Sequence, residues 1–261
     1  MRETTPTVHI VARPAVDLDG MRAYLDDVGG TAWLDRRLDE ADGAPNAGEL
    51  LVEFGGRACY RSWEPGLNPN VARVRTDQRE YLENILRSAH GSVLEHASYS
   101  FALRNVSRVF THELVRHRAG SAFSQESLRY VRLTDIGFRV PPALEPVRDQ
   151  VVSIVEQLEA FQRDAAAALG VDDDGVPFHV KKEVTSALRR LAPLGLSTDI
   201  IWTANVRTLR HVIEMRTAPG AEEELRSVFG LVAELMLAEA PSLFQDFERE
   251  GDSWVPAHRK V

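Results

Sequence analysis

Apolar residues recur at intervals of three and four along much of the chain, which is the spacing of one face of an α-helix. The clearest case is 221–239, where Leu225 and Val232 stand on the apolar face. Ser107 and Asn205 precede two other such segments and are of the type that caps a helix N-terminus. We predict helices over 19–27, 47–62, 71–89, 107–116, 144–169, 176–191, 205–216 and 221–239.

Shorter runs rich in β-branched and aromatic residues predict strands or extended segments between these helices. They cover 8–12, 97–103, 130–133, 137–142 and 197–203. No internal repeat, low-complexity segment or linker interrupts the chain. The pattern therefore predicts an α+β fold, with a mixed or antiparallel central sheet and several long helices, in a single domain over 1–261.

Composition narrows the function classes. The net charge of −8 argues against a general nucleic-acid binder, because such proteins are usually basic. No apolar run is long enough to span a bilayer, and the residues after Met1 lack the apolar core of a signal peptide. The single cysteine, Cys59, excludes an internal disulfide and a cysteine-based zinc site. We expect a cytoplasmic protein with no nucleic-acid or membrane partner.

The most chemically loaded stretch runs from Arg116 to Tyr130. It opens with Arg116-His117-Arg118 and buries little apolar surface for its length, which favours a binding surface for a small anion. Glycine-rich phosphate loops are absent from the sequence, so phosphate binding would depend on the forked guanidinium groups of arginines. The candidates are Arg116, Arg118, Arg129, Arg189, Arg190, Arg207 and Arg216.

Two single motifs permit other chemistries. His112 and His117 could form a zinc helix, but their i, i+5 spacing separates the rings by about 140° around a helix. Cys59 lies between Arg57 and Arg61, which could lower the pKa of its thiol. A lone cysteine on the inner side of a helix is more often an inert buried residue, and we prefer that interpretation.

Taken together, the motifs resemble those of the flavin-dependent thymidylate synthases. The family signature is Arg-His-Arg, seven residues, then Ser-x-Arg-Tyr, and 116–118 and 127–130 are similar to it. Two further blocks, at 90–96 and 202–216, follow the family pattern in the right order, and the resemblance spans about 85–220. The matching residues of these blocks are His90, Ser92, Glu95, His96, Trp202, Thr203, Asn205, Arg207 and Arg216.

The resemblance implies a reaction, cofactors and an assembly. The family methylates dUMP at uracil carbon 5, with methylenetetrahydrofolate as one-carbon donor, reduced FAD as hydride donor and NADPH as reductant. It implies a mixed α/β fold and a homotetramer whose active sites are shared between subunits, with no metal. No protein nucleophile is needed, which agrees with a chain whose one cysteine lies outside the motifs.

The resemblance also assigns roles by position. Arg216 matches the arginine that stabilises negative charge on the uracil ring, an electrostatic role. The implied substrate-binding residues are Glu113, Leu114, Val115, Arg116, Gln125, Glu126, Ser127, Leu128, Arg129, Arg189 and Arg216. The implied flavin-binding residues are Ser92, Arg116, His117, Arg118, Gln125, Asn205, Val206, Arg207 and His211.

One departure from the family pattern opens an alternative. Eight residues, rather than seven, separate Arg118 from Ser127, and the extra one lies within 119–122. An insertion there could reshape the pocket around the sugar, so the alternative is a methylase that accepts UMP, as in nucleoside-antibiotic biosynthesis. Otherwise the loop bulges outward and the substrate stays dUMP. Two other classes remain as hypotheses: a metal hydrolase using His112 and His117, and a non-catalytic nucleotide-binding protein.

Overall fold

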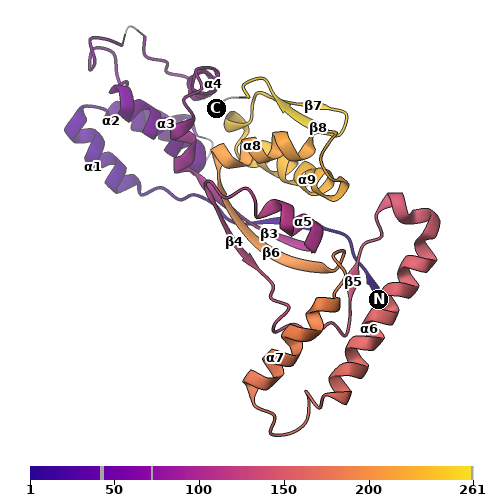
Figure 1. The fold of residues 1–261 in the computed structure, drawn as a ribbon. Coiled ribbons are helices and arrows are strands. Elements are labelled where there is room, and N and C mark those ends of the chain that lie inside the picture. The colour runs from indigo at the N-terminus through magenta and orange to yellow at the C-terminus, as the bar shows by residue number, and fades with distance from the viewer. Residues whose placement is uncertain (42–43, 72, 260) are drawn as a thin grey trace.

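The computed structural model describes residues 1–41, 44–71, 73–259 and 261. Its centre is a four-stranded antiparallel sheet in the order β2-β3-β6-β4 (Figure 1). The strands are β1 (Arg2–Glu3), β2 (Thr7–Ala12), β3 (Ser98–Ser107), β4 (Ser121–Gln125), β5 (Gly137–Phe138), β6 (Ser197–Asn205), β7 (Phe247–Glu250) and β8 (Ser253–Pro256). The predicted α+β class with an antiparallel central sheet is confirmed.

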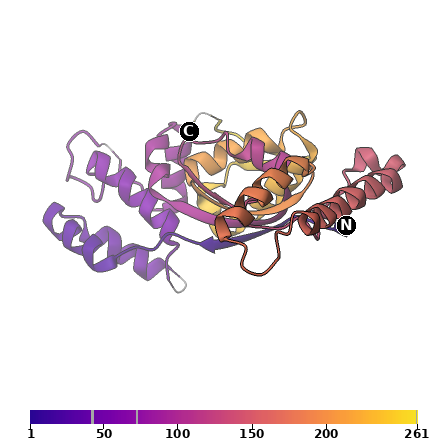
Figure 2. The ribbon, with the colours of Figure 1, turned by 60° about the horizontal axis from the view of Figure 1, so that its bottom comes forward.

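Helices surround this sheet on one face and at both ends (Figures 1 and 2). The α-helices are α1 (Leu18–Val28), α2 (Thr31–Glu40), α3 (Ala47–Tyr60), α4 (Gln78–Arg87), α5 (Arg108–Leu114), α6 (Arg148–Ala168), α7 (Phe178–Leu188), α8 (Val206–Thr217) and α9 (Glu223–Glu239). Short 3₁₀ helices are η1 (Gly91–His96), η2 (Pro142–Val147), η3 (Arg189–Leu191) and η4 (Pro241–Leu243). Helices α5, α8 and α9 cover the sheet, while α1 to α3 and α6 to α7 lie at opposite ends of it. Among the described residues, no helix is long and apolar enough to cross a membrane.

The main core lies between the sheet and its covering helices. Alternate residues of β6 are buried, and Trp202 stacks on Phe101 of β3 and meets Phe229 of α9 edge-on. Because side chains of a strand alternate between faces, the residues between them point to the opposite face. That face is open in this chain, and Ile201 is 42% exposed on it. The covered face of the sheet thus packs against α8, which carries motif residues.

The predicted helix over 71–89 is too long. Helix α4 begins only at Gln78, where the Asp77 side chain accepts a hydrogen bond from the backbone of Glu80. The preceding segment stays extended because its carbonyls serve buried arginines: Arg57 donates to Arg75 O at 2.6 Å, and Arg37 donates to Thr76 O at 2.5 Å. The prediction for residue 72 lies outside the described residues.

The predicted strand over 130–133 is also wrong. The backbone amides of Tyr130 and Val131 both donate to Ser127 O, which closes a turn. The strand of this region lies earlier, at β4, and pairs with β6 so that Phe123 faces Trp202. Helix α2 and the β7–β8 hairpin were not predicted at all. The other predicted helices and the strands over 8–12, 97–103 and 197–203 are present with shifted ends.

Candidate active site

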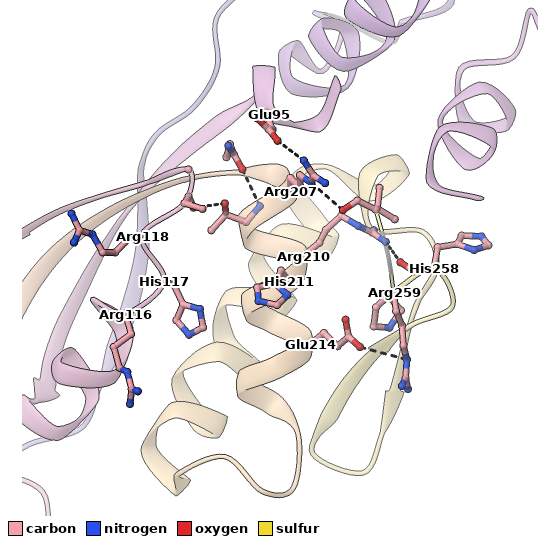
Figure 3. Close-up of a pocket in the computed structure, with 16 residues that line it drawn as sticks. Glu95, Arg116, His117, Arg118, Arg207, Arg210, His211, Glu214, His258 and Arg259 are labelled. Carbon is pink, nitrogen blue, oxygen red and sulfur yellow. Dashed lines mark hydrogen bonds and ion pairs between the residues drawn. The ribbon is translucent and has the colours of Figure 1, made fainter. Parts of the chain in front are cut away.

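A cavity of about 620 Å³ opens where the loop after α5 meets the start of α8 (Figure 3). Three groups of residues from distant parts of the sequence converge on it. They are 116–120 after α5, residues of α8 with its cap, and C-terminal residues from Pro256, at the end of β8, onward. Glu95 of η1 also lines the cavity. The lining residues are Glu95, Arg116, His117, Arg118, Ala119, Gly120, Asn205, Arg207, Thr208, Arg210, His211, Glu214, Pro256, His258, Arg259 and Val261.

Local sequence explains how the loop reaches the cavity. Helix α5 begins at its predicted cap, where Ser107 Oγ accepts from the Phe110 amide at 3.0 Å, and it ends after two turns. The chain then turns at Gly120, whose φ of +65° lies in the left-handed region. A Cβ on Gly120 would stand 2.5 Å from Thr208 Oγ1 and would also collide with the Asn205 side chain. Glycine is required here by both conformation and space.

Helix α8 fixes the other side of this turn. The Asn205 Oδ1 atom caps the helix by accepting from the Thr208 amide at 2.9 Å, as its position predicted. The Thr208 hydroxyl donates to Ala119 O at 2.8 Å, and the Asn205 amide donates to Gly120 O at 3.1 Å. The inserted region is therefore bound to the start of α8 at the cavity wall. It does not bulge away from the protein there.

The cavity carries an excess of positive charge. Five arginines line it against two glutamates. Arg207 pairs with Glu95 at 2.6 Å, whereas the exposed guanidinium groups of Arg116 and Arg118 have no side-chain partner among the described residues. The start of α8 adds the positive end of a helix dipole. The arrangement is suited to a ligand with a phosphate group.

At the cavity wall, three predicted residues form one hydrogen-bonded unit, in which His117 lines the cavity. Arg216 Nε donates to His117 Nε2 at 2.8 Å, and Arg216 Nη1 donates to Glu113 Oε2 at 2.7 Å. The Arg216 side chain is largely buried, at 15% exposure. Two bonds in different directions fix the plane of the guanidinium, which a single ion pair would not do.

The chemistry of this unit requires a neutral His117. A guanidinium N–H can only donate, so Nε2 of His117 must be unprotonated and its proton must lie on Nδ1. Burial, followed by the charges of Arg216, His211 and Arg116, lowers the pKa of His117 to about 4. The ring of His211 meets it edge-on at 6.1 Å. His117 therefore positions Arg216 rather than acting as a cation at neutral pH.

A second cluster of basic residues lies at the far end of α5. Arg108, at its first position, is close enough to Arg189 of η3 to feel its charge, and burial followed by that charge lowers the pKa of Arg108. The Arg108 Nη1 atom is buried without a hydrogen-bond partner among the described residues. An unsatisfied buried donor beside a second arginine is an arrangement that an anion would complete. Sequence analysis missed Arg108, although its place eight residues before Arg116 was visible.

The structure brings most of the predicted flavin residues together. Arg116, His117, Arg118, Asn205, Arg207 and His211 all line the cavity. Three others lie outside its lining, namely Ser92, Gln125 and Val206. Ser92 is exposed on η1, and Gln125 Nε2 donates to Thr111 Oγ1 at 3.0 Å. The Val206 side chain is fully buried, so a contact from that position would come from the backbone.

Of the predicted substrate residues, Arg116 lines the cavity, Glu113 and Arg216 bond to each other beside it, and Arg189 lies near Arg108. Leu114 and Leu128 are buried in hydrophobic cores, and Val115 is partly exposed. Glu126, Ser127 and Arg129 follow β4, where the Glu126 amide donates to Asp199 O at 2.9 Å and Ser127 Oγ accepts from the Arg129 amide at 3.4 Å. Arg129 and Arg189 are exposed. The site assignments stay predictions, supported by proximity in the first cluster and by charge in the second.

The structure also bears on Cys59 and on the zinc helix that His112 and His117 could form. The prediction that Cys59 is buried is wrong, because it lies exposed at the end of α3, one residue before the helix terminates. Cys59 is also absent from the cavity lining. The zinc helix is not formed, because α5 ends at Leu114 and His117 lies in the loop after it, where its Nε2 accepts from Arg216, while His112 is exposed on α5.

Comparison with known proteins places this site in context. The family described as thymidylate synthase complementing protein matches residues 44–242. The flavin-dependent thymidylate synthases of Mycobacterium marinum and Mycobacterium tuberculosis are each 38% identical over 214 residues, covering 80% of this chain and 82% of theirs.

Two solved structures share the fold. Thymidylate synthase X from Helicobacter pylori, solved with FAD and dUMP, aligns with a TM-score of 0.56 and 21% identity over 76% of this chain and 93% of its own. The UMP/dUMP methylase PolB from Streptomyces cacaoi, bound with 5-Br UMP, aligns with a TM-score of 0.56 and 19% identity over 93% and 94%.

Proposed function

Because this chain belongs to the flavin-dependent thymidylate synthase family, we propose that it methylates dUMP reductively at uracil carbon 5 with FAD as its bound cofactor. Methylenetetrahydrofolate would supply the carbon and NADPH the reducing equivalents. The observation that carries the proposal is the hydrogen-bonded unit of Glu113, His117 and Arg216, which adjoins the cationic cavity through His117.

The cavity residues fit a flavin dinucleotide. Arg116 and Arg118, whose guanidinium groups have no side-chain partner among the described residues, would supply positive charge beside the flavin ring, and the backbone of Gly120 and Asn205 lies at the positive end of the α8 dipole. When bound, FAD supplies the hydride that completes the methyl group. We assign Arg116, His117, Arg118, Asn205, Arg207 and His211 to its binding, with Ser92, Gln125 and the Val206 backbone as outer contacts.

Arg216 has the properties of an electrostatic activator. Its guanidinium is always charged and is held in one plane by neutral His117 and by Glu113, so it needs no rearrangement when negative charge develops on uracil. A fixed donor in a partly buried site stabilises such charge more than water does. Activation of this kind needs no cysteine, which agrees with Cys59 lying outside the cavity lining.

We assign the nucleotide phosphate to the second basic cluster. Arg108, Arg129 and Arg189 would share it, since the buried Nη1 of Arg108 lacks a partner in the described part of the chain. Residues 125–128, at the end of β4 and immediately after it, would position the sugar and base. A second substrate, UMP, is favoured by one observation, the inserted residue fixed at the cavity wall beside Thr208. We place dUMP first because the mycobacterial relatives are thymidylate synthases.

We propose that the protein is a homotetramer in which residues of neighbouring subunits complete the flavin and nucleotide sites. Exposed apolar side chains on the protruding helices α6 and α7 support self-association, including Ile154 at 58%, Phe161 at 43% and Phe178 at 68% exposure (Figure 1). The open face of the sheet is a further surface for a second copy. We also propose that residues 1–261 form one catalytic domain, because β2 near the N-terminus shares a sheet with β6. A cytoplasmic location is part of the proposal, because a chain with a single cysteine suits a reducing compartment.

The proposal is tested with purified protein, FAD, NADPH and methylenetetrahydrofolate. We expect a yellow protein that converts dUMP into dTMP. Parallel reactions with UMP decide the second substrate: methylation of UMP at a comparable kcat/KM would establish it, and absence of UMP turnover would remove it. A protein that binds no added FAD would contradict the proposed function.

A further inference from the structure

We propose that the segment after β8 forms a wall of the flavin cavity and that Arg259 in it is a cofactor-binding residue. The inference rests on the proposed function, because it takes the cavity to be the FAD site. Pro256, His258 and Arg259 all line the cavity, yet they lie beyond residue 242, where the match to the family ends. The motifs that identified the site contain none of them.

The segment is attached to α8 by a buried ion pair. Arg210 makes a two-pronged contact with Asp246, at 2.7 and 2.9 Å, and both side chains are almost fully buried. The same carboxylate accepts from the His258 amide at 3.1 Å, and Arg210 Nη2 donates to His258 O at 3.4 Å. One ion pair thus joins the cavity helix to the backbone of the lining segment.

Further contacts hold the hairpin before this segment. The Trp254 amide donates to the fully buried Thr217 Oγ1 at 2.8 Å, and the Ala257 amide donates to Asp246 O at 2.9 Å. At the far side of the cavity, Arg207 Nε donates to Val261 O at 3.1 Å. The described residues of this segment, 257–259 and 261, therefore have backbone groups fixed by several hydrogen bonds, which makes them a built wall of the cavity.

Arg259 is placed to reach a bound anion. Figure 3 shows its side chain beside Glu214 of α8, at the edge of the cavity opposite Arg116 and Arg118. Its only ion pair in the described part of the chain is a single contact, Nε to Glu214 Oε1 at 3.4 Å, and its side chain is 65% exposed. An exposed single-contact pair contributes little energy, so a phosphate in the cavity would displace Glu214 readily.

The two partners should then have opposite effects. Arg259 attracts the FAD diphosphate, whereas Glu214 repels it and competes for the guanidinium. Removing the arginine should weaken binding, and neutralising the glutamate should strengthen it. A purely structural pair would weaken binding in both variants, so the signs separate the two explanations.

The experiment measures FAD affinity by flavin fluorescence for wild type, Arg259→Gln, Glu214→Gln and the control Arg249→Gln. Arg249 is similarly exposed, at 56%, and lies on β7 of the same hairpin with a single 3.5 Å pair to Glu234. We expect Arg259→Gln to raise the Kd for FAD about tenfold, equivalent to about 1.4 kcal/mol, with a weaker salt dependence. Glu214→Gln should lower the Kd, and Arg249→Gln should match wild type.

Equal Kd values for Arg259→Gln and Arg249→Gln would overturn the inference, as would weaker binding in Glu214→Gln. At saturating FAD, the control Arg249→Gln should retain the wild-type kcat for dTMP formation, because Arg249 does not belong to the cavity lining. Failure of the proposed function is distinguishable, since wild type itself would then bind no FAD.

Discussion

The guanidinium of Arg216 makes two hydrogen bonds at once, and replacing it with lysine separates charge from geometry. An Arg216→Lys variant keeps the positive charge but offers one compact ammonium in place of a planar fork. It cannot reach His117 Nε2 and Glu113 Oε2 together from the positions that Nε and Nη1 occupy, 2.8 and 2.7 Å from those atoms. The charge would then no longer be fixed toward the cavity.

The magnitude follows from the loss of a fixed donor. Removing one preorganised donor to a developing negative charge costs about 2.7–4 kcal/mol, or about 10²–10³ in kcat. We expect Arg216→Lys to lose turnover in this range while its KM for dUMP changes by less than about threefold, because the bond matters mainly in the transition state.

The assay is dTMP formation from dUMP at saturating FAD, NADPH and methylenetetrahydrofolate. Arg249→Lys on β7 serves as the matched control, and thermal melting checks that both variants fold. A kcat for Arg216→Lys within threefold of wild type would refute the argument, since charge alone would then suffice without the orientation given by His117 and Glu113.

Three further predictions concern the same region. Burial, and then the charge of Arg216, lowers the pKa of His117 from 6.5 to about 4, so turnover should persist until the pH approaches the lower value. The fold should lose stability as the pH falls between those values, because the unfolded chain binds a proton there that the folded chain excludes. In His117→Asn, which keeps an acceptor but does not titrate, urea unfolding at each pH should show that this part of the stability loss is absent. Gly120→Ala should cost about 1–3 kcal/mol from strain at φ +65° and weaken FAD binding, measured by urea unfolding and fluorescence, whereas wild-type values for both would contradict the assigned turn. Asp246→Asn should cost about 3–5 kcal/mol by leaving buried Arg210 without its charge partner, and unchanged urea stability would disprove that role.

The acid sensitivity of the Asp246 pair has a defined sign. Burial raises the pKa of this carboxyl, but the hydrogen bonds and charge of Arg210 outweigh it, so the pKa lies below its ordinary value. The stability from the pair is therefore present above the ordinary carboxylate pKa and is lost as the pH falls through the lowered value. Loosening of the cavity wall should accompany that loss.

Sequence patterns predicted the elements whose apolar faces are regular. Helix α9 and strand β6 were found because burial on one face imposes a period, and Ser107 and Asn205 were found because a cap needs a side-chain acceptor. The helix over 71–89 was overextended because its first residues are held by Arg37 and Arg57, contacts that no local pattern records.

The site was predicted in the same uneven way. Motif residues on α8 and after α5 meet at one cavity because α8 follows β6 and α5 follows β3, and these two strands are neighbours in the central sheet. Arg108 was missed because an unsatisfied buried donor is visible only once its surroundings are known. The wall formed by Arg259 was missed because its place depends on Arg210 and Asp246, which are 36 positions apart.

The central claim is flavin-dependent methylation of dUMP without a protein nucleophile. The most direct test is dTMP formation by the Cys59→Ala variant, with and without FAD, in the presence of NADPH and methylenetetrahydrofolate. The account predicts a rate equal to that of wild type with FAD and no product without it. Loss of turnover in a folded Cys59→Ala variant that still binds FAD, or dTMP formation in the absence of flavin, would contradict it.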